Sequence, residues 1–197
     1  MSRAEVEGIV CSGECRGRQH TYALLDERVP PTPELTKEEA LARLATAYFR
    51  SHAPATLQDF SWWSGLPLTE ARQSISLLEP ELMSEQWNSQ TWYIHDSCRT
   101  AGKATGNLHL LPSYDEYLIG YKDRTDVLPK EDYSKAFTNN GLFFPVLLYK
   151  GHVVGNWNKA SKKKEIFPEH SLFRKDICLE EELLNQAKEK YVRFLTH

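Results

Sequence analysis

Residues 56–78 read TLQDFSWWSGLPLTEARQSISLL, and this stretch decides the fold. It has the pattern of two short helices joined by a tight turn at Gly65, where the backbone must reverse sharply. Thr56 is suited to the N-cap of the first helix and Thr69 to the N-cap of the second. The second helix has apolar residues at helical spacing on one face, namely Ala71, Ile75 and Leu78. The stretch therefore predicts a helix-turn-helix.

The flanking residues extend this unit on both sides. Residues 81–95 form two strand-like runs around a turn at Asn88 and Ser89, which predicts a hairpin. Before the helix pair, a capping-box pattern at Thr36 starts a segment with helical spacing of its apolar residues. Helix, helix-turn-helix and hairpin in this order predict a winged helix over residues 36–96.

The outward face of the second predicted helix is the candidate DNA-binding surface. It carries Thr69, Arg72 and Gln73, and both Arg and Gln can make bidentate contacts to bases. Glu70 lies among them, however, and the helix brings little positive charge to phosphates. Helix pairs with the same spacing also occur in proteins that never contact nucleic acid, so both interpretations stay open here.

The composition indicates a globular protein that is close to neutral. The chain has 197 residues, 41% of them hydrophobic, and a net charge of −3. Residues 1–100 carry 9 Lys and Arg against 14 Asp and Glu, whereas residues 101–197 carry 15 against 13, so positive surface is local. There is no secretory signal and no membrane-length apolar run, so we expect a cytoplasmic protein without membrane contact.

The cysteine and glycine patterns indicate neither a metal nor a cofactor. The spacing of the cysteines does not complete a four-ligand zinc site, which leads us to expect free thiols and no metal. No phosphate-binding glycine loop is present either, so we expect no nucleotide cofactor. The four cysteines are Cys11, Cys15, Cys98 and Cys178.

The first 35 residues are predicted to stand apart from the winged helix. Residues 1–28 contain two strand-like runs, the first of them beginning near Val6, and predict a hairpin whose tip holds Arg16 and Arg18. These arginines suit either phosphate contact or a solvated loop. A hairpin with no helices before it suggests a chain that starts part-way through a unit, or a surface that pairs with a second copy or a partner chain. Residues 29–35 are a proline-rich linker.

The second half predicts a connector and a small β-rich domain. Residues 97–107 are polar and contain glycine, as expected of a connector. Residues 108–197 predict an α+β domain that is closed by a C-terminal helix. Its expected elements are a helix with an aromatic face from Tyr114 to Tyr121, strands over 143–149, 152–157 and 166–173, and the terminal helix over 179–195.

Two charged clusters in this half are candidate functional groups. The strongest local positive charge is the lysine cluster made up of Lys159, Lys162, Lys163 and Lys164. It is compatible with contacts along a sugar-phosphate backbone, or with a solvated loop. The carboxylates of Asp115, Glu116 and Asp123 could serve acid–base chemistry in a cleft, but ion pairs on a helix surface are the preferred interpretation.

Three blocks of sequence together resemble the AlkZ-like winged-helix proteins, over nearly the whole chain. The blocks are RGRQHTYALLDERVP at 16–30, ATLQDFSWWSGL at 55–66 and LHLLPSYDEYLIGYKDR at 108–124. That family includes bacterial DNA glycosylases that excise bulky alkylated bases and unhook interstrand crosslinks. The resemblance implies tandem winged helices followed by a small β-rich domain.

One departure from the family bears on catalysis. The resemblance implies a catalytic Gln-x-Gln or Gln-x-Asp motif in an N-terminal winged helix, and neither triplet occurs in residues 1–197. The opening hairpin then resembles the wing of a preceding unit that is absent from this sequence. We therefore name no catalytic residue in this chain.

The sequence thus predicts an α+β protein that binds double-stranded DNA weakly and without strong sequence preference. The expected contacts are Thr69, Arg72, Gln73, Arg16, Arg18 and the lysine cluster. A DNA glycosylase completed by another chain and a protein-interaction module that pairs through the opening hairpin are the alternatives.

Overall fold

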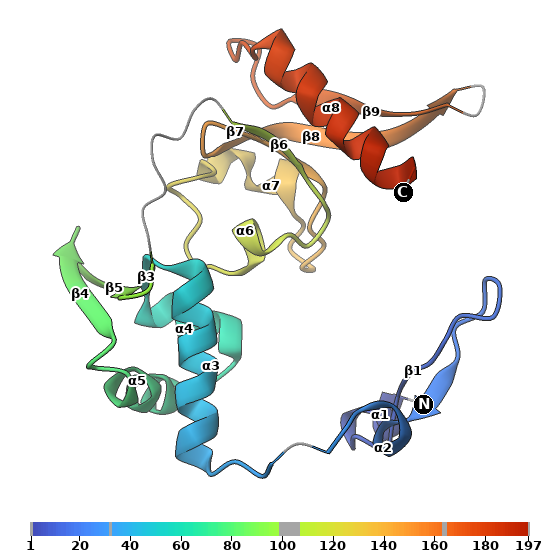
Figure 1. The fold of residues 1–197 in the computed structure, drawn as a ribbon. Helices are drawn as coiled ribbons and strands as arrows, with labels where there is room; N and C mark the ends of the chain where they lie inside the picture. Colours follow the sequence, from blue (N-terminus) through green and yellow to red (C-terminus); the bar gives the residue numbers. More distant parts are fainter. Residues whose placement is uncertain (1, 32, 99–106, 163–164, 197) are drawn as a thin grey trace. The chain divides into compact units, whose positions relative to one another are not determined.

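The computed structural model describes residues 2–31, 33–98, 107–162 and 165–196 (Figure 1). The chain divides into two compact units, Met1–Glu39 and Ala40–His197. The predicted boundaries between a winged helix, a connector and a C-terminal domain lie within the second unit and stay a prediction. Most of the predicted connector, residues 99–106, lies outside the described part of the chain.

The first unit is a small hairpin flanked by two short helices. Strands β1 (Val10–Ser12) and β2 (Tyr22–Leu24) pair antiparallel, as predicted. The expectation of a strand beginning near Val6 is wrong, because helix α1 (Ser2–Val6) occupies that segment. An Arg3–Glu7 ion pair of 2.8 Å spans one helical turn, the spacing at which opposite charges favour helix. Helix α2 (Leu25–Arg28) follows β2.

The second unit begins with the elements of a winged helix. They are α3 (Lys37–His52), β3 (Ala55–Thr56), α4 (Leu57–Ser64), α5 (Leu68–Leu77), β4 (Leu82–Trp87) and β5 (Gln90–His95). The three strands form one antiparallel sheet in the order β3-β5-β4. Helix α3 starts within the first unit and continues into the second.

Local sequence signals account for the boundaries of these elements. At α4, the Thr56 hydroxyl accepts from the Asp59 amide, and the Asp59 carboxylate accepts from the Thr56 amide, which is a capping box. Gly65 ends α4 in the left-handed conformation, with φ of 70°, as the predicted turn requires. Thr36 and Glu39 form an equivalent capping box at α3.

The winged-helix core is aromatic and fully packed. Tyr48 and Phe49 of α3 meet Phe60 of α4, with ring centroids 5.3 and 5.4 Å from Phe60, and all three residues have no exposed surface. Ala71 and Ile75 of α5 join the same cluster. Burial of these side chains, rather than helix propensity, holds the three helices together.

The rest of the second unit is built on a four-stranded antiparallel sheet. Its strands are β6 (Leu108–Leu111), β7 (Val146–Tyr149), β8 (His152–Lys162) and β9 (Glu165–Leu172), in the order β6-β7-β8-β9. Helices α6 (Glu116–Ile119) and α7 (Tyr133–Ala136), a 3₁₀ turn (Lys130–Asp132) and helix α8 (Glu181–Thr196) complete the fold. Strands β7, β8 and β9 and the C-terminal helix agree with the predicted elements, whereas β6 was not predicted.

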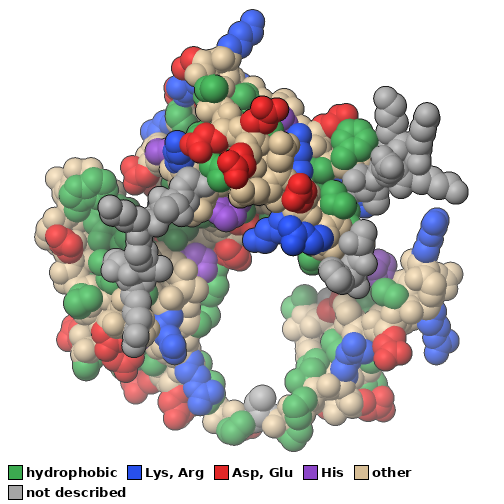
Figure 2. Space-filling model, turned by 45° about the horizontal axis from the view of Figure 1, so that its top comes forward, with side chains coloured by type: hydrophobic (Ala, Val, Ile, Leu, Met, Phe, Trp, Pro, Cys, Tyr) green, Lys and Arg blue, Asp and Glu red, His purple; other side chains and the backbone are tan. Residues whose placement is uncertain are grey.

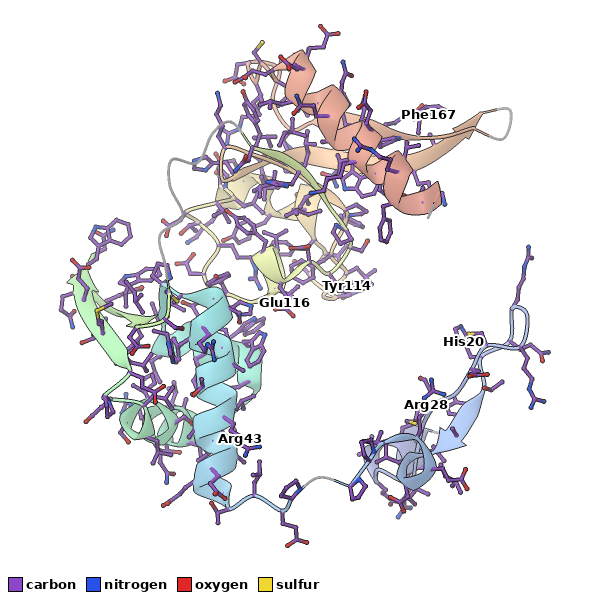
Figure 3. All side chains as sticks on the ribbon, in the orientation of Figure 1. His20, Arg28, Arg43, Tyr114, Glu116 and Phe167 are labelled. Atoms are coloured by element: carbon purple, nitrogen blue, oxygen red, sulfur yellow. The ribbon has the colours of Figure 1, made fainter. Side chains whose placement is uncertain are left out.

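The helix expected from Tyr114 to Tyr121 is shorter than predicted. Helix α6 has four residues, and Asp115 caps it by accepting from the Tyr117 amide at 2.9 Å. Tyr114, labelled in Figure 3, lies before the helix with φ of 59° and is half exposed. The tyrosine spacing therefore does not form a single aromatic helix face, because Asp115 sets a later start.

The sheet carries a separate apolar core on each face. Val146 and Leu148 of β7 pack with Leu118 of α6, whereas Leu147 between them packs with Ala187 of α8. This alternation follows from the two-residue period of a strand. Figure 1 shows α8 lying along the sheet, as the predicted closing helix requires. None of the described helices is long and apolar enough to cross a membrane.

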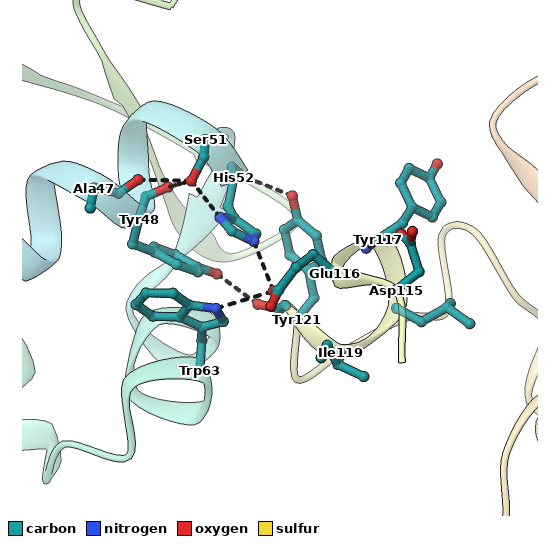
Figure 4. A network of polar contacts seen from close by, with 12 residues as sticks. Ala47, Tyr48, Ser51, His52, Trp63, Asp115, Glu116, Tyr117, Ile119 and Tyr121 are labelled. Carbon is teal, nitrogen blue, oxygen red and sulfur yellow. Dashed lines mark hydrogen bonds and ion pairs between the residues drawn. The ribbon is translucent and has the colours of Figure 1, made fainter. Parts of the chain in front are cut away.

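Polar contacts join the winged-helix elements to the segment around α6 (Figure 4). Glu116 accepts a hydrogen bond from Trp63 Nε1 at 3.2 Å and lies 3.2 Å from His52 Nε2. The buried Tyr48 hydroxyl donates to the carbonyl of Gly120 at 3.0 Å. The pKa of Tyr48 is raised, and burial is the largest cause of this shift. These contacts fix the start of the segment that follows α6 against α3 and α4.

Candidate nucleic-acid interface and an adjoining cleft

Helix α5 presents the predicted DNA-binding face to solvent. Thr69, Arg72 and Gln73 are all exposed, while Ser74 and Ile75 are buried against α4 and the core. The structure thus brings these three predicted residues together on one accessible helix face.

The predicted capping role of Thr69 is wrong. Helix α5 begins at Leu68, and Pro67 occupies the N-cap position without a side-chain cap. The Pro67 carbonyl accepts the first helical bond from the Ala71 amide at 2.9 Å. A proline with φ of −55° is already suited to enter a helix, so the helix starts one residue before the threonine signal. Thr69 is therefore a surface residue in the first turn of α5.

The remaining predicted contacts lie on other elements. Arg16 and Arg18 are exposed on the hairpin of the first unit, where Arg16 and Gln19 pair through their backbones. Lys159 is exposed on β8. The backbone of Lys162 ends β8, but its side chain and the whole of Lys163 and Lys164 lie outside the described part of the chain. The lysine cluster as a unit therefore stays a prediction.

The hairpin of β4 and β5 forms the wing, and its turn is the one predicted. Asn88 and Ser89 have φ of 48° and 61°, the two positive values that a tight two-residue hairpin turn requires. Trp87 immediately before the turn is 56% exposed. A large indole held in solvent on a wing is available for contact with a ligand.

A cleft of about 720 Å³ adjoins the wing. Three segments line it: the wing, the start of α4 and the chain from the end of α6 to α7. Its aromatic lining residues are Trp87, Trp92, Tyr117, Tyr121 and Tyr133, and its cationic lining residues are Lys122, Arg124 and Lys130. Sequence reasoning missed this cleft, because only tertiary packing brings the three segments together.

Two carboxylates of the cleft lining accept hydrogen bonds from other groups of the protein. Asp59 is 4% exposed and accepts from the Lys122 amide through Oδ1 at 2.9 Å, in addition to its capping bonds. Asp123 accepts from the amide and the hydroxyl of Thr125, and these bonds hold the pKa of Asp123 below its usual value. These groups therefore hold loops in place.

The predicted carboxylate cluster is not assembled as an acid–base site. Asp115 caps α6, Glu116 contacts Trp63 and His52, and Asp123 holds the turn at Thr125. Of the three carboxylates, Glu116 alone has an ion-pair partner among the described residues, His52, whereas Asp115 and Asp123 accept from backbone amides.

Burial shifts the pKa values of two further residues that line the cleft. Burial, with a smaller effect from the negative charge of Asp59, raises the pKa of Tyr121 to about 12. Burial also lowers the pKa of Arg124, whose guanidinium lies 5.4 Å from the ring centroid of Phe143. Tyr121 is therefore a neutral hydrogen-bonding group at physiological pH, and its hydroxyl donates to the His52 carbonyl at 2.8 Å.

Charges of both signs are interspersed on the face drawn in Figure 2. That distribution agrees with the net charge of −3. Among the described residues, no group of three or more His, Cys, Asp or Glu is arranged to hold a metal ion.

The order of elements and the exposed α5 define a winged-helix protein with an added antiparallel sheet. The AlkZ-like DNA glycosylase family model matches residues 1–194, and the chain belongs to this family. The family prediction and the α+β fold class are thus confirmed.

A solved structure gives the same fold. The chain is similar to the Streptomyces sahachiroi DNA glycosylase AlkZ with a TM-score of 0.78 and 21% sequence identity, over 91% of this chain. The match covers 50% of the Streptomyces chain, so the present chain spans half the length of that relative. Comparison with curated proteins gives no match.

Proposed function

We propose that this chain binds duplex DNA through α5 and the wing. One observation carries the proposal: α5 turns Arg72 and Gln73 to solvent while its opposite face is buried in the winged-helix core. Helix-turn-helix proteins place this helix in the major groove, where Arg and Gln side chains can form paired hydrogen bonds with base edges. Membership of a DNA glycosylase family supports the same ligand.

The proposed binding is weak and depends on salt more than on sequence. The phosphate contacts come from Arg16 and Arg18 of the first unit and from the lysine cluster, which lies in the half of the sequence with a small excess of positive charge. The chain as a whole is negative, so long-range attraction to DNA is small. Each phosphate contact contributes about 0.9 to the slope of log affinity against log salt concentration.

The proposal does not include base excision by residues 1–197 alone. It rests on the absence of a Gln-x-Gln or Gln-x-Asp triplet from this sequence and on the structural roles of the carboxylates described above. Family membership favours a second candidate, a DNA glycosylase completed by another polypeptide. Release of an alkylated base from duplex DNA by the purified chain would favour that candidate over the first.

A protein-interaction role through the first unit is the remaining alternative. The short strands β1 and β2 form a two-stranded sheet, and such a sheet is marginal in water without further pairing. The solution mass tests this alternative, because a strict monomer counts against pairing of two copies.

The direct test is a titration of fluorescently labelled duplex DNA followed by anisotropy, at low and at moderate salt. Wild-type protein should bind at low salt and lose affinity steeply as salt rises. Arg72→Ala should weaken binding about tenfold, because one paired contact is lost. Arg43→Ala is the matched control, since Arg43 is an exposed arginine on α3 and not on α5 (labelled in Figure 3). Equal affinities for the two variants would reject the proposed role of α5.

A further inference from the structure

The cleft beside the wing presents two indoles at close range. Trp87 and Trp92 line it with ring centroids 5.9 Å apart and planes inclined by 56°. Trp87 is more than half exposed, whereas Trp92 is partly buried. Because no core packing requires the exposed indole of Trp87, its face is available to stack on a planar ligand.

The cleft lining has lysines that can contact a negatively charged group of a ligand. Lys122 and Lys130 are both exposed and line it. The ammonium of Lys122 donates to Gln58 Oε1 at 3.3 Å, which holds it at the cleft. The lining also has three carboxylates, Asp59, Asp123 and Asp126, of which the first two accept from protein donors, so its positive and negative charges balance. Both lysines are exposed and are accessible to a phosphate.

The amide side chains match the edge of a base. Gln58, Asn88 and Gln90 all line the cleft, and each amide offers both a donor and an acceptor. The volume of about 720 Å³ lies in the range of small-ligand sites and is too small for a duplex. The combination of indole face, amides and ammonium groups fits a single nucleotide better than an apolar ligand.

We propose that this cleft binds one unpaired nucleotide of a nucleic-acid strand, with the base stacked on Trp87 and the phosphate at Lys122 and Lys130. The base edge meets the amides of Gln58, Asn88 and Gln90. The inference rests on the proposed DNA binding for its biological setting, but the cleft is a separate site from the α5 face. It gives the wing a second role, in holding a base that has left its partner strand.

The test uses pentadeoxythymidylate with the full chain, followed by quenching of tryptophan fluorescence and by anisotropy of a labelled copy. Wild-type protein should bind at low salt. Trp87→Ala should weaken binding about tenfold, because one base–indole stack is lost, and Trp87→Phe should recover part of the affinity. Tyr114→Ala is the matched control, since Tyr114 is 51% exposed and lies outside the cleft.

The lysines give an independent readout. Lys122→Ala and Lys130→Ala should each lower the salt dependence of oligonucleotide affinity by about 0.7 in slope, whereas Lys190→Ala on α8 should not change it. No binding of the oligonucleotide at low salt, or wild-type affinity in a folded Trp87→Ala variant, would overturn the inference.

The two proposals fail separately. Arg72→Ala should weaken binding of duplex DNA and leave binding of pentadeoxythymidylate unchanged. If wild-type protein binds the oligonucleotide but does not bind duplex DNA, the α5 interface alone is rejected. Duplex binding without any oligonucleotide binding would reject the cleft alone.

Discussion

Replacement of Asp59 by alanine should destabilise the second unit far more than an ordinary loss of a helix cap. Asp59 is 4% exposed, and its two oxygens accept from the Thr56 amide at 3.0 Å, the Thr56 hydroxyl at 2.6 Å and the Lys122 amide at 2.9 Å. Loss of the cap costs about 1 kcal/mol. The Lys122 amide would also lose its acceptor in a part-buried position, at a cost of about 1–3 kcal/mol. We expect a total of about 3 kcal/mol.

A matched control isolates the effect of burial and of the tertiary bond. Glu39 makes the same capping box at α3, accepting from the Thr36 amide at 2.8 Å, but both residues are exposed. Glu39→Ala should cost about 0.5–1 kcal/mol. Asp59→Asn keeps an acceptor oxygen and should fall between the two alanine variants.

Urea unfolding followed by tryptophan fluorescence is the appropriate assay. All five tryptophans lie within Ala40–His197, so the signal reports the second unit. A free energy of unfolding for Asp59→Ala no lower than that for Glu39→Ala would refute the reasoning. In that case the bond to Lys122 would contribute nothing to joining the winged-helix elements with the segment that follows α6.

Two further predictions concern the pH dependence of stability at Asp132 and the replacement of two glycines, Gly155 and Gly65. Burial raises the pKa of Asp132, but hydrogen bonds from Lys135 and Arg174 outweigh it and hold the pKa below its usual value of 3.8. A lowered pKa in the folded state stabilises the protein above about pH 4, and this stability is lost as the pH falls through the folded-state pKa. Asp132→Asn should therefore flatten the acid side of the curve of unfolding free energy against pH, and an unchanged curve would contradict this. Gly155→Ala should cost about 3 kcal/mol, because a Cβ there would collide with the Ser171 carbonyl, whereas Gly65→Ala should cost about 1–2 kcal/mol, from its φ of 70° alone. Equal midpoints of urea unfolding for the two variants would argue against the collision.

Features with local causes could be predicted from the sequence. The capping box at Thr36, the N-cap at Thr56, the turn at Gly65 and the hairpin turn at Asn88 all depend on residues within a few positions of one another. Strands β7, β8 and β9 of the C-terminal sheet were equally accessible, and the continuous apolar run of Val146, Leu147 and Leu148 reflects a strand with two buried faces.

Features with tertiary causes could not be predicted in this way. The cleft joins segments around Gln58, Trp87 and Lys130, which lie far apart in the chain and carry no shared motif. The start of α5 at Leu68 depended on Pro67 rather than on the better capping residue Thr69. Spacing of tyrosines suggested a longer helix at α6, but the cap at Asp115 excludes Tyr114 from it.

The most direct test of the central claim is a map of amide chemical shifts in isotope-labelled protein as duplex DNA is added. The proposed DNA interface predicts shifts concentrated in residues 68–77 of α5 and in the wing over residues 82–95, with loss of these shifts as salt rises. Shifts confined to α8 or to the first unit, with α5 unaffected at saturating DNA, would contradict it.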